Sequence, residues 1–224
     1  MKKRLGCFHA HHSNIEHIEK ALKPYNIELI HFVDPGLDRI KMDSNFTDEV
    51  AQKKIKDTLE WISNCHVDAI LITCTFFTAN IEQDRLSSSI PIIKIDDPLF
   101  HSICEKDEPQ ILVFTNPNTV EGTMNQLINF ATKQKKNIQV EPYLLENTFD
   151  LIMEGKKEEY IESVSSGLNR LISNHPDRIV SAAQLSMVPA AEIIESKTDT
   201  YVGNHLKSLS NYLEELLKLN VYQK

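Results

Sequence analysis

Short apolar runs alternate with longer amphipathic stretches along the chain, and this alternation constrains the fold more than any other feature. The apolar runs have the length of buried strands, and they lie at residues 4–10, 27–33, 68–74, 91–95, 110–115, 138–145, 178–184 and 200–204. Strands that alternate with helices form parallel sheets with right-handed crossovers. The sequence therefore predicts an α/β fold.

The intervening stretches have the periodicity of helices that bury one face. They predict helices over residues 14–23, 47–64, 119–135, 157–174, 188–196 and 205–219. Thr47 is the expected N-cap of the second of these helices. "DDP" at 96–98 predicts one more helix, with an N-cap aspartate and with Pro98 at the first helical position.

Two of the expected helices carry clear apolar stripes. The residues of 47–64 that we expect to face inward are Val50, Ile55, Leu59 and Ile62. The closing helix carries an apolar face made of Leu206, Leu209, Leu213, Leu216 and Leu217. Because this stripe spans too few heptads for a coiled coil, it is predicted to pack into the core.

The strand pattern occurs twice, with four strands in each run. "DAILITCTFF" from residue 68 and "DRIVSAAQLSM" from residue 177 are counterparts, since each is a third strand that opens after an aspartate. We therefore expect two similar lobes, each a mostly parallel sheet of about four strands flanked by helices. The expected lobes are residues 1–98 and 99–204, with the closing segment 205–224 joining the first lobe.

Composition and charge exclude several classes of partner. The chain has 224 residues and a formal net charge of −8, without a block of basic residues that could follow a phosphate backbone, so we expect no nucleic acid. No apolar run approaches the roughly 18–20 residues of a membrane helix, so we expect no membrane partner. The four cysteines have no paired spacing and no export signal precedes them, which predicts reduced thiols and a cytoplasmic location.

Cys74 closes the third expected strand, in "ILITCTFFTAN". Ligands of open α/β sheets bind at the carboxyl ends of strands, and the N–H groups of a helix that begins there lower the pKa of a thiol. Buried cysteines are also common as small apolar residues. From the residues alone, a functional Cys74 and a structural Cys74 are both open.

Two further segments contain polar side chains at strand ends. In "TNPNTVEGT" (115–123), Thr115 ends a strand and Thr119 can cap the next helix, and the same hydroxyls and amides can hold a carboxylate. "HAHH" (9–12) has three imidazoles, but their spacing is not that of a metal motif and no cysteine or carboxylate nearby in the sequence completes a set. We therefore expect no metal site, and we interpret His9 as a substrate contact.

The ordered set "LGCFHA", "VDPGL", "DAILITCT", "PIIKIDDP", "FTNPNTVEGT" and "AAQLSM" resembles the aspartate/glutamate racemase superfamily, with its hydantoin racemase, maleate isomerase and arylmalonate decarboxylase relatives. The resemblance spans roughly residues 4 to 204. It implies two similar lobes with an active site between them, and chemistry without any cofactor. In the racemases of this group, one cysteine removes the proton next to a carboxylate and a second cysteine returns one.

The resemblance also assigns residues. Cys74 matches the cysteine of the first lobe. Residues that match substrate-binding positions are His9, Thr75, Phe76, Thr119 and Thr123. Thr115 is expected to bind substrate because it ends its strand in the same segment as Thr119 and Thr123. The second cysteine is missing from "SAAQLSM". The motif places Gln184 there, with Ser186 two residues on, whereas counting from the two aspartates places Ala183 there.

The resemblance therefore implies a cofactor-independent enzyme with one thiol, Cys74, as acid/base or nucleophile. Its expected partner is a small carboxylate substrate, and the reaction is racemisation, isomerisation or decarboxylation at the carbon next to the carboxylate. The alternative is a non-catalytic protein that only binds a carboxylate. A homodimer is compatible with the sequence.

Overall fold

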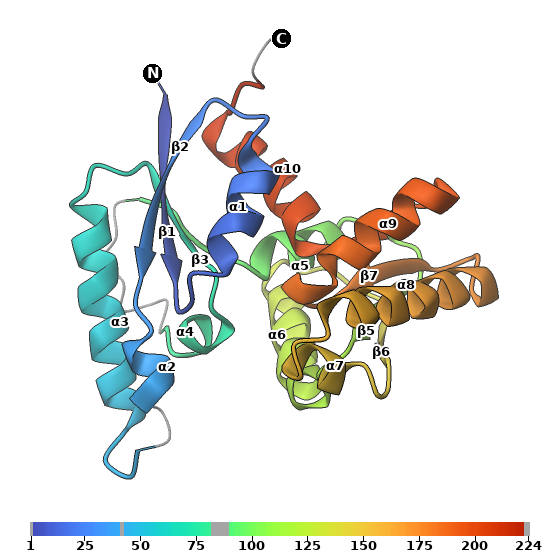
Figure 1. The fold of residues 1–224 in the computed structure, drawn as a ribbon. Helices are drawn as coiled ribbons and strands as arrows, with labels where there is room; N and C mark the ends of the chain where they lie inside the picture. Colours follow the sequence, from blue (N-terminus) through green and yellow to red (C-terminus); the bar gives the residue numbers. More distant parts are fainter. Residues whose placement is uncertain (1, 41–42, 82–89, 222–224) are drawn as a thin grey trace. The chain divides into compact units, whose positions relative to one another are not determined.

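Two four-stranded parallel sheets form the framework of the chain. The structure, a computed structural model, describes residues 2–40, 43–81 and 90–221, and of Asp38, Thr75 and Ala79 it describes the backbone alone. The strand orders are β2-β1-β3-β4 and β6-β5-β7-β8, so both sheets repeat the same connectivity. This confirms the expected α/β fold with two similar sheets (Figure 1).

The strands follow the apolar runs closely. Their bounds are β1 Lys3–His9, β2 Ile27–Val33, β3 Ala69–Ile72, β4 Ile92–Lys94, β5 Gln110–Phe114, β6 Val140–Leu144, β7 Ile179–Ala182 and β8 Val202–Gly203. The third strand of each sheet ends two residues earlier than expected. The last residues of both apolar runs therefore belong to the turns that follow β3 and β7.

The helices connect these strands. Their bounds are α1 Asn14–Leu22, α2 Gly36–Ile40, α3 Asp48–Ser63, α4 Thr75–Ala79, α5 Asp97–Cys104, α6 Pro117–Lys133, α7 Phe149–Met153, α8 Lys157–Asn174, the 3₁₀ turn η2 Leu185–Met187, α9 Val188–Thr198 and α10 His205–Leu217. Thr47 caps α3 as predicted, because its side chain accepts a hydrogen bond from the backbone N–H of Val50. The short helices α2 and α7 were not expected.

The chain forms two compact units. Unit 1 contains Met1–Asp96 and Leu209–Lys224, and unit 2 contains Asp97–Ser208. Residues 222–224 of the expected closing segment lie outside the described residues. Within unit 1, the last turns of α10 pack near α1, where the Ser210 hydroxyl donates to the carbonyl of Ala21 at 3.2 Å.

The sheet of unit 1 has a helix on each face (Figure 1). On one face, α3 buries Ile55, Leu59 and Ile62 against the strand residues Phe8, Ile70 and Ile72. Gly6 lies on this face, and a Cβ there would come within 2.7 Å of Ile62, so the glycine permits the close approach of α3. Side chains alternate along a strand, so Cys7 and His9 lie on the opposite face, towards α1.

Unit 2 has the same layered construction. On one face of its sheet, α8 and α9 supply Tyr160, Val164, Leu168, Ala190 and Ile194, which pack with Ile111, Val113 and Val180. On the other face, α5 and α6 supply Leu99, Phe100, Ile103 and Leu127, which pack with Leu112 and Phe114. Both faces of each central strand are therefore covered by apolar side chains, as is typical of parallel sheets.

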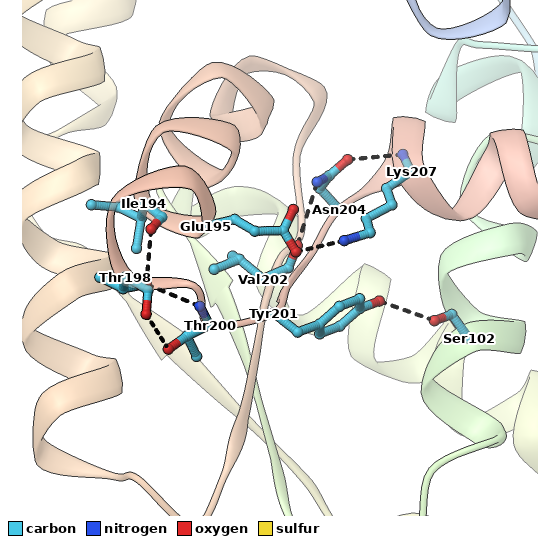
Figure 2. A network of polar contacts seen from close by, with 9 residues as sticks. All are labelled: Ser102, Ile194, Glu195, Thr198, Thr200, Tyr201, Val202, Asn204 and Lys207. Carbon is cyan, nitrogen blue, oxygen red and sulfur yellow. Dashed lines mark hydrogen bonds and ion pairs between the residues drawn. The ribbon is translucent and has the colours of Figure 1, made fainter. Parts of the chain in front are cut away.

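A polar network fixes the path of the chain from α9 through β8 to α10 (Figure 2). The Lys207 ammonium contacts the Glu195 carboxylate at 2.5 Å, and the backbone N–H of Lys207 donates to the side-chain oxygen of Asn204 at 3.0 Å. The hydroxyl oxygen of Tyr201 lies 3.4 Å from the hydroxyl oxygen of Ser102. These contacts stabilise the short strand β8 at the edge of the sheet.

Several details differ from the expectations. Val50 is 45% exposed because the buried face of α3 runs through Ala51, one position further along the helix. Leu216 is 39% exposed because it lies at the edge of the apolar stripe of α10. Pro98 occupies the second position of α5 rather than the first, because the helix begins at Asp97. No helix in the described part of the chain is long and apolar enough to cross a membrane.

Candidate functional site

Cys74 lies at the carboxyl end of the sheet of unit 1. It follows the last residue of β3 by two positions and is the N-cap residue of α4, with extended backbone dihedrals (φ −106°, ψ 118°). It is half-buried, and it is a thiol like the other three cysteines. The carboxyl edge of an open parallel sheet is where such folds bind their ligands.

Gln184 holds the equivalent position in unit 2. It follows the last residue of β7 by two positions and is the extended N-cap residue of η2 (φ −138°, ψ 142°). The residues before Cys74 and Gln184 also correspond. The Thr73 N–H donates to the carbonyl of Phe8 in β1, and the Ala183 N–H donates to the carbonyl of Val113 in β5, and each acceptor is the last residue but one of its strand. Ala183 was the alternative counterpart of Cys74 when positions were counted from Asp68 and Asp177. That count is one residue short in unit 2, because Arg178 lies between Asp177 and the start of β7.

The side-chain oxygen of Gln184 accepts three hydrogen bonds. The backbone N–H of Thr115 donates to it at 2.7 Å, the Thr115 hydroxyl at 2.8 Å and the backbone N–H of Asn116 at 3.2 Å. Backbone N–H groups are donors only, so the atom that faces them is the oxygen. The two N–H bonds of the Gln184 amide group are therefore the part of this side chain that remains for a ligand.

These bonds fix the direction of a longer chain of hydroxyls. Because Thr115 gives its proton to Gln184, the Tyr160 hydroxyl, 3.1 Å away, has to donate to Thr115. Ser186, 2.9 Å from the Tyr160 oxygen, then has to donate to Tyr160. A hydroxyl has one proton and two lone pairs. Ser186 therefore presents lone pairs rather than a proton to any further partner.

Tyr160 is the member of this chain that sequence reasoning missed. It comes from the first turn of α8 and is completely buried. Burial is the largest influence on its phenol and raises its pKa, while the hydrogen bonds with Ser186 and Thr115 act in the opposite direction. A buried tyrosine requires a hydrogen-bond partner, so its place on the inward face of a predicted helix was the signal that could have identified it.

The N-terminus of α6 is capped differently from the prediction. Asn116 is the N-cap residue, and its side-chain oxygen accepts from the N–H of Asn118 at 3.0 Å. Thr119 lies inside the first turn, and its hydroxyl donates to the carbonyl of Asn116 at 2.9 Å. Asn116 takes the cap because Pro117 starts the helix two positions earlier than expected. Thr123 lies one turn further along the same helix and is half-buried.

His9 is completely buried at the end of β1, and both of its ring nitrogens have partners. Nδ1 lies 2.8 Å from the Thr73 hydroxyl and Nε2 lies 2.9 Å from Nδ1 of His31. Burial, followed by the proximity of His31, lowers the pKa of His9 from 6.5 to about 4, so His9 is neutral at pH 7. Its role as a substrate contact stays a prediction.

Thr75 and Phe76 follow Cys74 in α4. The ring of Phe76 lies 6.3 Å from the rings of both Phe46 and Phe77, so it covers the edge of the apolar core of unit 1. The side chain of Thr75 is outside what the structure describes. What these two residues offer at the strand end is therefore the backbone of the first turn of α4.

Two other features have no part in the contacts described above. His11 and His12 are exposed, and His11 Nδ1 lies 2.8 Å from the Ser13 hydroxyl. A groove of about 530 Å³ lies between α8 and α9, and its lining includes Glu158, Ser165, Asn169, Ile194 and Lys197. None of the predicted site residues is among those that line this groove.

The fold resembles those of several solved racemases. An allantoin racemase from Klebsiella pneumoniae matches with a TM-score of 0.69 at 15% identity, over 96% of this chain and 88% of that chain. An aspartate racemase homologue from Pyrococcus horikoshii matches with a TM-score of 0.67 at 12% identity, over 97% and 100%. A glutamate racemase from Francisella tularensis in complex with D-glutamate matches with a TM-score of 0.63 at 17% identity, over 97% and 81%.

No protein-family model matches the sequence, and no curated protein matches it significantly in sequence. The likeness is therefore carried by the structure, and it extends over almost the whole chain. At these identities the matches establish the arrangement of the chain rather than its chemistry. The chain has the fold of the aspartate/glutamate racemase superfamily.

Proposed function

We propose that this chain is a racemase-like isomerase that acts on a small acid at the carbon next to a carboxylate, with Cys74 as the group that moves the proton. The proposal rests on the racemase fold together with the sequence motifs. The hydrogen attached to such a carbon is weakly acidic. Its removal needs a base in contact with it and donors that stabilise the negative charge on the carboxylate.

The observation that carries the proposal is the position of Cys74. It is half-buried and follows a buried strand by two residues, at the edge of the sheet where open α/β folds bind ligands. A thiolate at this edge is a suitable base for carbon, because sulfur combines a moderate pKa with accessible lone pairs. The other half-buried cysteine, Cys65, lies at the opposite end of β3, after α3.

The reaction that we propose uses one thiol. The equivalent position in unit 2 is occupied by Gln184, whose amide group neither gives nor takes a proton near pH 7. Ser186 is also unsuitable as an acid, because its proton is held by Tyr160. The thiol therefore removes the proton from one face in an isomerisation, solvent supplies a proton to the opposite face, and the thiol then gives its proton back to solvent. In a decarboxylation the thiol delivers one proton to the carbanion that is left.

The remaining predicted residues have complementary roles in substrate binding. The amide N–H bonds of Gln184 are suited to a carboxylate oxygen, and the lone pairs of Ser186 are suited to an O–H or N–H group of the substrate. The backbone of Thr75 and Phe76 would donate to a carboxylate next to Cys74. Thr123 would contact the substrate through its hydroxyl, and Thr119 would have to exchange its bond to Asn116 for a bond to the substrate.

The test is turnover of a panel of compounds by the parent protein and by Cys74→Ala and Cys74→Ser. The panel contains single enantiomers of aspartate, glutamate and allantoin, which the names of the structural relatives suggest, together with 2-hydroxy acids and substituted malonates. Chiral chromatography and release of CO₂ are the readouts. We expect the parent to convert at least one compound and both Cys74 variants to lose about 100-fold or more in kcat/KM.

Cys65→Ala is the matched control, since Cys65 is also a half-buried thiol but donates to the carbonyl of Trp61. It is expected to keep the parent's rate. Equal rates for parent and Cys74→Ala would contradict the role of Cys74. Binding of a panel member by calorimetry, without turnover by the parent, would indicate the carboxylate-binding protein instead of the enzyme.

A further inference from the structure

Three metal-ligating side chains converge on one face of the sheet of unit 1, and the proposed reaction uses none of them to move protons. The Sγ of Cys7 and one ring nitrogen each of His9 and His31 all lie within 4.8 Å of one another. The sequence pattern explains the convergence. Cys7 and His9 alternate on β1 and share a face, and the register of β1 with β2 places His31 directly opposite Cys7.

The arrangement of the two imidazoles resembles that of paired metal ligands. His9 Nε2 and His31 Nδ1 face each other at 2.9 Å, and a single hydrogen lies between them. If each ring holds its hydrogen on its outer nitrogen instead, both facing nitrogens offer lone pairs to an ion. The rings then need acceptors for the two outer N–H groups.

One acceptor is within hydrogen-bond distance, and the other lies slightly beyond it. The outer nitrogen of His9, Nδ1, lies 2.8 Å from the Thr73 hydroxyl, and that of His31, Nε2, lies 3.8 Å from a carboxylate oxygen of Glu19 on α1. His31 Nε2 is buried and has no hydrogen-bond partner among the described residues. Histidines that bind metals usually donate their other N–H to a carboxylate or another oxygen in this way.

The environment also selects the ion. Cys7 and His9 are fully buried, and a thiol among imidazoles is a borderline-soft ligand set that suits Zn²⁺ or Co²⁺ better than Mg²⁺ or Ca²⁺. We infer that Cys7, His9 and His31 bind one zinc-type divalent cation, with the Cys7 thiolate, His9 Nε2 and His31 Nδ1 as ligands. Water takes the fourth position of the tetrahedron.

The proton balance of binding is defined. Each imidazole keeps one proton, and only the ring whose hydrogen lies between the two facing nitrogens moves it to the outer nitrogen. The Cys7 thiol loses its proton as the sulfur–metal bond forms. One proton is therefore released for each ion bound. The ion would join β1 to β2 and would fix the ring of His9 against Thr73, the residue before Cys74. The expectation of a metal-free chain considered only His9, His11 and His12, and it could not place His31 beside them.

The test uses the full chain after treatment with a chelator, titrated with Zn²⁺ and with Co²⁺. We expect one ion per chain, one proton released as measured by calorimetry in buffers of different ionisation enthalpy, and a thiolate-to-cobalt charge-transfer band in the near ultraviolet. Cys7→Ala is expected to abolish the band and to weaken Zn²⁺ binding by about 100-fold. His31→Gln is expected to weaken binding similarly, and it serves as the readout if Cys7→Ala does not fold.

Two controls separate this site from adventitious binding. The double variant His11→Ala/His12→Ala removes the exposed imidazoles, and Cys104→Ala removes another buried thiol. Both are expected to keep the affinity and the band. The inference is overturned if the parent binds no stoichiometric ion, if His31→Gln and a folded Cys7→Ala bind as tightly as the parent, or if the double variant abolishes binding.

Discussion

The side-chain oxygen of Gln184 lies 2.7 Å from the backbone nitrogen of Thr115. This bond joins the turn after β7 to the turn after β5, the two central strands of unit 2. It also determines which part of Gln184 remains for a ligand. Gln184, at the position in unit 2 that is equivalent to Cys74 in unit 1, thus has a structural role of its own.

Replacing Gln184 with Ala should destabilise the protein. The substitution leaves the N–H groups of Thr115 and Asn116 and the Thr115 hydroxyl without their acceptor. Unmade hydrogen bonds of partly buried groups cost about 1–3 kcal/mol in the free energy of unfolding. Urea denaturation followed by circular dichroism measures the loss.

Gln184→Glu separates this structural role from substrate binding. A carboxylate oxygen accepts the same three hydrogen bonds, so the free energy of unfolding should stay closer to the parent's than that of Gln184→Ala. The N–H donors are lost and a negative charge is introduced, so affinity for a carboxylate substrate should fall. An unchanged affinity for the substrate in Gln184→Glu would remove Gln184 from the binding site.

Tyr160→Phe should be destabilising although it keeps the buried ring. The substitution removes the acceptor of the Ser186 proton and the donor to Thr115, which we expect to cost about 1–2 kcal/mol. Thermal and urea unfolding measure the difference. Ser165→Ala on the same helix is the control, because the Ser165 hydroxyl is buried without a partner among the described residues and its removal should cost little. Equal stability of Tyr160→Phe and the parent would contradict the hydroxyl chain.

The stability difference between parent and Tyr160→Phe should narrow at high pH. Burial raises the pKa of Tyr160 above its ordinary value of 10.0. A raised pKa gives stability that is fully present below about pH 10, where the unfolded phenol is also protonated, and that is lost as the pH rises towards the folded pKa. The free energies of unfolding of the parent and of Tyr160→Phe, measured between pH 8 and pH 11, should show this narrowing. A difference between them that stays constant with pH would contradict the raised pKa of Tyr160.

Most of the fold could be predicted because its signals are local. The apolar runs and amphipathic periods predicted the eight strands and the long helices that the described residues form, and the bounds of β2 and α8 coincide with the expected ones. Positions at element ends could not be predicted as well. Whether Thr119 or Asn116 caps α6 depends on where Pro117 starts the helix, and the sequence offered two adequate capping residues.

The candidate site was only partly predictable for a different reason. Cys74, Thr115, Gln184 and Ser186 follow strands and could be found from sequence order. Tyr160 and His31 could not be found in this way, because they reach the polar groups from α8 and β2. Their partners are distant in the sequence and near only through strand register and helix packing. That Cys74 and Gln184 hold equivalent positions in their own sheets also became clear only from the observed ends of β3 and β7.

Gly203→Ala should destabilise unit 2. Gly203 pairs with Ser181 across β7 and β8, and a Cβ at this position would lie 2.9 Å from the Ser181 Cβ and closer still to its hydroxyl. Such overpacking typically costs about 1–3 kcal/mol. Gly122→Ala is the opposite case, since nothing lies within 4 Å of its Cβ position and alanine favours helix α6 by about 0.5–1 kcal/mol. Thermal unfolding of the parent and of both variants measures these changes, with a lower Tm expected for Gly203→Ala and a higher one for Gly122→Ala.

The most direct test of the central claim is exchange of the substrate's α-hydrogen with solvent in D₂O, followed by proton NMR. The substrate is the compound that the parent converts. If Cys74 moves this proton, the α-hydrogen signal disappears with the parent and with Cys65→Ala, and it disappears about 100-fold more slowly or at the background rate with Cys74→Ala. Exchange at the parent's rate in Cys74→Ala would contradict the account.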